Sequence, residues 1–129
     1  MKTKKNIQTK KEQLETILSN LKSVGGILNS AVISRDGLLV ASDLTKNIDG
    51  DTFAAMSAAM EGAAETAVSE LKQGELKQII VDADEGKLIT LSAGKKALLV
   101  VLTKPEINIG LVLLELGRAS DKLSNLLGD

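Results

Sequence analysis

Serine and lysine stand three residues apart at three places in the chain, a spacing that on a helix brings a hydroxyl nucleophile within one turn of a base. The pairs are Ser19/Lys22, Ser69/Lys72 and Ser92/Lys95. Acyl transfer by such a pair needs companion catalytic motifs, which the sequence lacks. In a chain rich in serine and lysine, chance is the simpler explanation for all three pairs.

Carboxylates gather at two places and raise the possibility of hydrolysis or metal binding. Asp82, Asp84 and Glu85 form one cluster, and Asp49 and Asp51 form the other. Neither cluster has the ligand-rich loop that calcium requires. Aspartate also accepts backbone N–H bonds in turns and at helix N-termini, so these structural roles are the preferred interpretation.

The residue types that most other catalytic sites require are absent from the sequence. The chain contains no histidine, cysteine, tryptophan or tyrosine. Gly86-Lys87 and Gly94-Lys95 lack the preceding glycine of a phosphate-binding loop. We therefore expect a protein that is not an enzyme, with no catalytic residue, no cofactor and no metal.

Charge is distributed unevenly along the 129 residues. Five lysines precede the first acidic residue, Glu12, which leaves 11 of the 16 basic residues against all 17 acidic ones, a net charge of −6 for the rest of the chain. An acidic body disfavours nucleic acid as a partner. We expect residues 1–9 to be a flexible basic arm, with contact to an anionic membrane or polyanion as the alternative.

No apolar run approaches the roughly 18 residues of a membrane span, and the basic start leads into mixed polar sequence rather than a signal peptide. The expectation is a cytoplasmic protein without stable membrane insertion. Its length suits a single domain, which we place at residues 10–129.

Periodicity predicts the secondary structure. Apolar residues at helical spacing predict helices over residues 9–24, 53–73 and 109–127, although Val112 to Leu114 could instead form a sixth strand. Arg35-Asp36-Gly37 predicts a hairpin turn between strands 27–34 and 38–42, and three further strands follow at 76–83, 87–93 and 97–103. The last strand is apolar on both faces and should be central.

The element order α-β-β-α-β-β-β-α predicts an α+β sandwich, with a five-stranded antiparallel sheet in the order 2-1-5-4-3 and helices on both faces. Strands two and three are then the edges.

Two apolar faces distinguish the second helix. One stripe contains the larger residues: Phe53, Met56, Met60, Ala63 or Ala64, Ala67 and Leu71. The face beside it consists of small residues: Ala55, Ala58, Ala59 and Gly62. A helix resting on a sheet needs only one stripe. A neighbouring helix could cover the second face, or alanine could simply be helix filler. The third interpretation is that the helix meets its own image in a symmetric dimer, with strand three extending the sheet across the same axis. The interface residues expected on this basis are Ala55, Met56, Ala59, Met60, Gly62, Ala63, Ile79 and Val81.

The whole pattern resembles the Roadblock family, which includes Roadblock-type dynein light chains and MglB-like regulators of Ras-like GTPases. The likeness covers about residues 10–127 and is carried by the order of four segments: Ser34-Arg35-Asp36-Gly37-Leu38-Leu39, Phe53-Ala54-Ala55-Met56, Leu98-Leu99-Val100-Val101-Leu102, and Asn108-Ile109-Gly110-Leu111 before Leu113-Leu114-Glu115-Leu116. The resemblance implies a profilin-like sandwich that dimerises through its second helix and third strand and binds a small Ras-like GTPase.

The leading hypothesis is therefore a non-enzymatic scaffold or regulator that associates with itself or a paralogue and binds such a GTPase. One alternative is an adaptor whose partners do not depend on nucleotide, as the likeness to dynein light chains implies, and another is a small-molecule sensor. The two arginines, Arg35 and Arg118, are expected to be solvated or ion-paired rather than to act as an arginine finger.

Overall fold

The first helix begins at a capping box. The computed structural model describes residues 8–128, so residues 1–7 of the expected basic arm lie outside the described part. The Thr9 side chain accepts from the Glu12 amide and the Glu12 carboxylate accepts from the Thr9 amide, which satisfies two free N–H groups at the helix start. Helix α1 runs over Lys10–Asn20 and tightens into a 3₁₀ turn, η2, over Leu21–Ser23.

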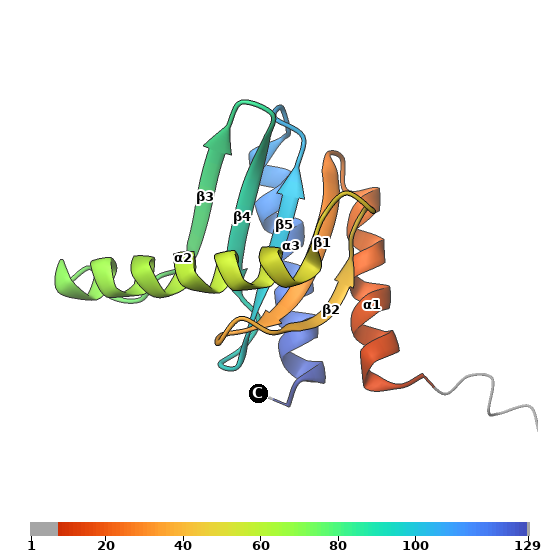
Figure 1. Cartoon of the computed structure of the whole chain (residues 1–129), viewed down its shortest axis with the longest axis horizontal. Coiled ribbons are helices and arrows are strands. Elements are labelled where there is room, and N and C mark those ends of the chain that lie inside the picture. Colours follow the sequence, from red (N-terminus) through yellow and green to blue (C-terminus); the bar gives the residue numbers. More distant parts are fainter. Residues whose placement is uncertain (1–7, 129) are drawn as a thin grey trace, which may run out of the picture.

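Five antiparallel strands form one sheet in the order β2-β1-β5-β4-β3, which confirms the predicted topology and both predicted edges (Figure 1). The two strands predicted at 27–34 and 97–103 have the predicted bounds. The strands are β1 (Ile27–Ser34), β2 (Leu39–Asp43), β3 (Gln78–Ala83), β4 (Gly86–Ser92) and β5 (Ala97–Thr103).

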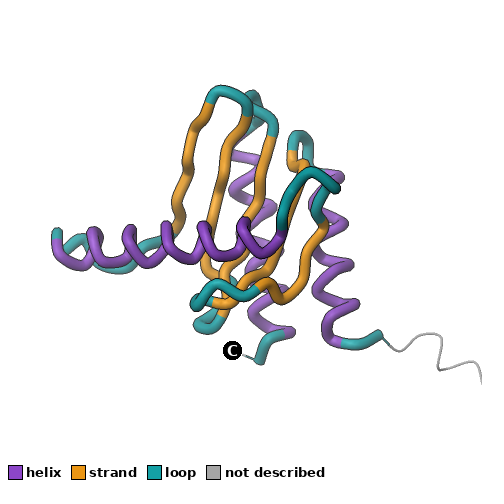
Figure 2. Tube along the Cα trace, viewed as in Figure 1, coloured by secondary structure: helices purple, strands orange, loops and turns teal. Residues whose placement is uncertain are grey.

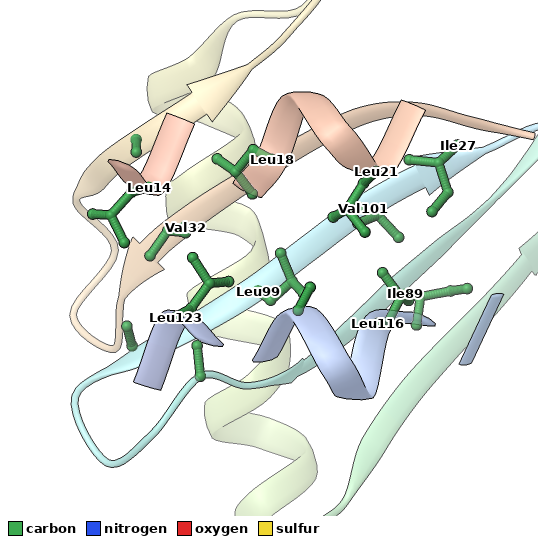
Figure 3. Close-up of a cluster of buried hydrophobic side chains, with 14 of the residues drawn as sticks. Leu14, Leu18, Leu21, Ile27, Val32, Ile89, Leu99, Val101, Leu116 and Leu123 are labelled. Carbon is green, nitrogen blue, oxygen red and sulfur yellow. The ribbon is translucent and has the colours of Figure 1, made fainter. Parts of the chain in front are cut away.

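Helices α1 and α3 cover one face of the sheet. Helix α3 spans Ile109–Leu126, so Val112 to Leu114 are helical rather than a sixth strand, and the Asn108 side chain caps the helix by accepting from the Leu111 amide. Leucines of both helices point onto the strands, where Leu99 of the central strand is fully buried (Figure 3). The strand predicted to be apolar on both faces is thus central, as expected.

Helix α2, over Gly50–Glu70, crosses the opposite face and begins at Asp49, whose side chain accepts from the Asp51 amide. Phe53 at its start packs against the sheet, and the other apolar contacts with the sheet cluster are made by the small residues Ala54 and Ala58. Ala54 is completely buried against a cluster that contains Ala31 of β1 and Val100 of β5. Because alanine adds only one carbon beyond the backbone, the helix lies close to the strands.

The second half of α2 leaves the sheet. The helix axis runs across the strands and continues beyond the edge strand β3 (Figures 1 and 2). After Glu61, no described residue of α2 is buried. We call residues 62–70 the α2 overhang. Among the residues that the structure describes, no helix combines the length and apolar character needed to cross a membrane.

Candidate interaction site

None of the eight expected interface residues is buried within the protomer. Met60 and Ile79 are partly covered, and the other six are exposed. Among the larger of these side chains, Met56 is 67% exposed and Val81 is 38% exposed. These residues are therefore available to a partner.

The sequence leaves open which of the two apolar faces of α2 rests on the sheet, and the structure turns Met56 of the large-residue stripe away from the strands. The residues of α2 that face the strands lie on a neighbouring side of the helix: Ala54, Ser57, Ala58 and Glu61. The physical reason is size, because small side chains allow a helix to approach a sheet more closely than methionine does. The larger residues are left at the sides of the helix.

The edge strand β3 offers both a free edge and apolar faces. Within the described part of the chain, β3 pairs only with β4. Its register places Ile79 beside Thr90 and Val81 beside Leu88, on the face that α2 crosses, while Ile80 lies on the opposite face. An edge of this kind is a template for adding another strand.

Part of the sheet face beside α2 is open. A surface pocket of about 570 Å³ lies at the start of β1 and the end of β5, and its lining includes Leu28, Ile48 and Leu102. A second pocket, of about 290 Å³, continues from Ile48 to Phe53 and Met56. The apolar surface thus extends from the side of α2 across the uncovered part of the strands.

A polar junction anchors the middle of α2. Glu61, only 4% exposed, accepts a hydrogen bond of 3.0 Å from the Thr90 hydroxyl on β4. Burial raises the pKa of Glu61 and the nearby Glu65 raises it further, whereas the Thr90 hydrogen bond and Arg35 act in the opposite direction. Nη1 of Arg35 lies 3.9 Å from Glu61 and 3.0 Å from Glu65.

Arg35 is ion-paired, as expected, and Arg118 is too, through Glu115. The sequence interpretation missed Glu61. A signal was present, because Ala54, Ser57 and Ala58 stand seven, four and three residues before it and mark the sheet-facing side of the helix. A carboxylate on that side must have a partner in the sheet.

One residue of each acidic cluster has a structural role. Asp49 caps α2, and Asp82 pairs with Lys87 at 2.8 Å. Ser92, a member of one serine–lysine pair, accepts a hydrogen bond from Arg35. Across residues 8–128 there is no group of three or more histidine, cysteine or acidic side chains arranged to hold a metal ion.

The sequence model of the Roadblock/LC7 domain matches residues 13–103, and the chain belongs to that family. Three uncharacterized proteins of Methanocaldococcus jannaschii are each 36% identical to it over 110 residues. The matched region is 85% of this chain and 92–96% of the relatives.

Solved structures share the fold. Myxococcus xanthus MglB superimposes with a TM-score of 0.85 at 20% identity, covering 94% of this chain and 92% of MglB. A structure described as MglB with tetrameric arrangement gives 0.83 at 21%, covering 93% and 91%. Acanthamoeba castellanii profilin IB gives 0.62 at 16%, covering 91% and 98%, so the fold is also profilin-like.

Proposed function

We propose that this chain, acting as one domain over residues 10–129, is a non-enzymatic regulator or scaffold that associates with itself or a paralogue and binds a small Ras-like GTPase. The observation that carries the proposal is the incomplete α2 side of the protomer. An α-helix passes beyond the sheet, and beside it the edge strand exposes Ile80 and Val81 and leaves Ile79 partly covered.

A two-fold axis beside β3 would complete both features at once. Pairing two β3 strands joins two five-stranded sheets into one and satisfies the free backbone groups of both edges. The nine residues of the overhang span about 13 Å, and neighbouring strands are about 4.8 Å apart. Counted from Glu61 over β4, each overhang would pass its own β3 and reach over the partner's β3 toward the partner's β4, where Val81 and Leu88 lie.

Self-association is tested by Ala59→Arg. This residue is exposed on the protomer, so the variant should fold, while a dimer would bring two added cations together near the axis. We expect a dimer for the wild-type chain and a monomer for the variant in sedimentation velocity. The control is Leu114→Arg, at a 52% exposed leucine on α3, which should remain dimeric. A monomeric wild type, or a dimeric Ala59→Arg, would refute this interface.

The GTPase partner is proposed from family membership and from the chain's lack of histidine and cysteine, since a protein that acts by presenting a surface needs neither. Immobilised protein is used to capture partners from a lysate in GDP and in a non-hydrolysable GTP analogue. A small GTPase retained in one nucleotide state by the wild type, and lost with Ala59→Arg, is the expected result. Partners retained equally in both nucleotides would favour the adaptor alternative.

A further inference from the structure

The α2 overhang is held in direction by very little apolar packing. Its residues are exposed or partly covered, and Leu71 at its end is 69% exposed. Beside it lies a pocket of about 370 Å³ between Glu65, residues 74–76 of the α2–β3 connection and the β4–β5 turn. Another kind of contact must set the angle at which the helix leaves the sheet.

That contact is made by Arg35 at the start of the β1–β2 turn. Its Nε donates to the carbonyl oxygen of Lys95 at 2.8 Å, and Nη2 donates to Oγ of Ser92 at 2.8 Å and to the carbonyl oxygen of Gly94 at 3.3 Å. Nη1 donates to Oε2 of Glu65 at 3.0 Å. The guanidinium thus fixes the β4–β5 turn with three bonds and uses the fourth to hold α2.

Glu65 stands one helical turn beyond Glu61, where the Thr90 bond pins the helix to β4. Two anchors one turn apart define a direction as well as a position. From Glu61 to Leu71 the helix rises about 15 Å, so a tilt of about 10° would move its end by about 2.6 Å. That displacement is more than half the spacing between neighbouring strands.

We propose that Arg35 is a positioning residue for self-association: by holding Glu65 against the β4–β5 turn, it sets the angle of the α2 overhang so that the overhang meets a second copy of this chain in register. The inference rests on the proposed function. It assigns Arg35 a role in presenting the interface without contacting the partner. Arg35 acts through Glu65, which is 30 residues further along the sequence.

The geometry explains why arginine stands at this position. Four hydrogen bonds leave the side chain in three directions, toward the turn carbonyls, the serine hydroxyl and the helix carboxylate. A planar guanidinium supplies separate donors along fixed directions, whereas a lysine ammonium has one nitrogen that cannot reach all of them. A lysine at position 35 should therefore make only some of these hydrogen bonds and retain only part of the function of Arg35.

The first experiment measures the dimer dissociation constant by sedimentation velocity over a dilution series, with interference optics because the chain lacks tryptophan and tyrosine. We expect a constant about tenfold higher for Arg35→Met, and about threefold higher for Arg35→Lys and for Glu65→Gln, as the helix loses its preset angle. Arg118→Met breaks an exposed pair on α3 and should leave the constant unchanged.

Far-UV circular dichroism establishes which variants are folded. If Arg35→Met is not folded, Glu65→Gln decides the question, because Glu65 is about half exposed and its loss should spare the core. Folded Arg35→Met with the wild-type dissociation constant would overturn the proposal. So would an unchanged constant for Glu65→Gln where Arg35→Met cannot be tested.

The second experiment measures the helix angle directly. The chain has no cysteine, so Thr16→Cys on α1 and Ser69→Cys on the overhang give two unique sites for spin labels. With labelled protein diluted into unlabelled protein, the distance distribution between them should be narrow for the wild type and broad or displaced with Arg35→Met. An unchanged distribution would overturn the proposal.

The two experiments separate this inference from the proposed function. A wild-type chain that stays monomeric refutes self-association, and with it the role of Arg35 in presenting the interface, even if the label distances respond to Arg35→Met. A dimer that is insensitive to Arg35 and Glu65 refutes only the positioning role.

Discussion

On one side of the sheet, α1 and α3 close over 15 buried apolar residues, whereas the cluster beneath α2 on the other side contains five. The first side fills its volume with leucine and valine. To the second, α2 contributes only Ala54 as a buried apolar residue, together with one buried carboxylate that bonds to β4, while an arginine reaches across from a turn. The difference indicates a division of labour, in which the α1/α3 side stabilises the protomer and the α2 side is built to be completed by a partner.

The largest expected effect tests whether the α1/α3 side carries the stability. Leu99→Ala should lower the free energy of unfolding by about 2–5 kcal/mol, because it leaves a cavity at a fully buried position of the central strand. Val81→Ala at the exposed edge is the comparison, and should cost about 1 kcal/mol or less. Urea unfolding of both in the Ala59→Arg background separates protomer stability from association. Equal losses would contradict the division.

A smaller effect is expected from enlarging the contact under α2. Ala54→Leu adds three carbons where the helix lies directly on β1 and β5, and should cost about 1–3 kcal/mol through overpacking. Urea unfolding gives the value. Ala59→Leu, at an exposed position of the same helix, is the matched control and should leave protomer stability nearly unchanged. A stable, unperturbed Ala54→Leu would mean that α2 can lift from the sheet without penalty.

Two helical glycines allow a test in which each substitution adds a single methyl group. A Cβ on Gly62 of α2 or Gly117 of α3 would meet no atom within 4 Å. Alanine at either position should raise protomer stability by about 0.5–1 kcal/mol, since glycine is the poorer helix former. Only Gly62→Ala should also weaken the dimer in sedimentation velocity. Identical behaviour of the two variants would place the interface elsewhere on the molecule.

The smallest effect concerns pH. Because the pKa of Glu61 is raised in the folded protein, the folded state binds this proton more readily than the unfolded chain does. Its contribution to stability is therefore greatest at low pH and is lost as pH rises from about 4.5 through the folded pKa. Urea midpoints measured across that window should fall less with pH in Glu61→Gln than in the wild type. Glu70→Gln, on the same helix, retains Glu61 and is the control; parallel wild-type and Glu61→Gln profiles would contradict the assignment.

Local patterns were enough to predict most of the fold. The hairpin at Arg35-Asp36-Gly37 was predicted because an Asp-Gly pair between apolar runs favours a tight turn, and Gly37 indeed has a φ of 97°. The central place of β5 followed from its apolar residues on both faces. The sheet order could be predicted because it depends on these strands and on a helix that must cross one face, and the structure confirms it.

Long-range contacts were harder to predict. Helical spacing gives apolar faces but does not say which of two neighbouring faces lies on the sheet, so the pattern alone did not assign Ala54, Ser57 and Ala58 to the strands. The ties from Arg35 to Glu65 and to Ser92 join residues 30 and 57 positions apart, so no local pattern contains them. The expected interface residues stay a prediction, because burial between copies depends on a second chain.

The edge strand β3 has a consequence for how this protein must be handled by a cell. Between Gln78 and Asp82 lie three successive β-branched residues, Ile79, Ile80 and Val81, on a strand whose outer edge has no partner in the protomer. Short runs of this kind promote amyloid-like stacking when they stay unpaired, and flanking polar residues slow it. Assembly would then act as protection against aggregation, because it pairs the strand edge that stacking would otherwise use.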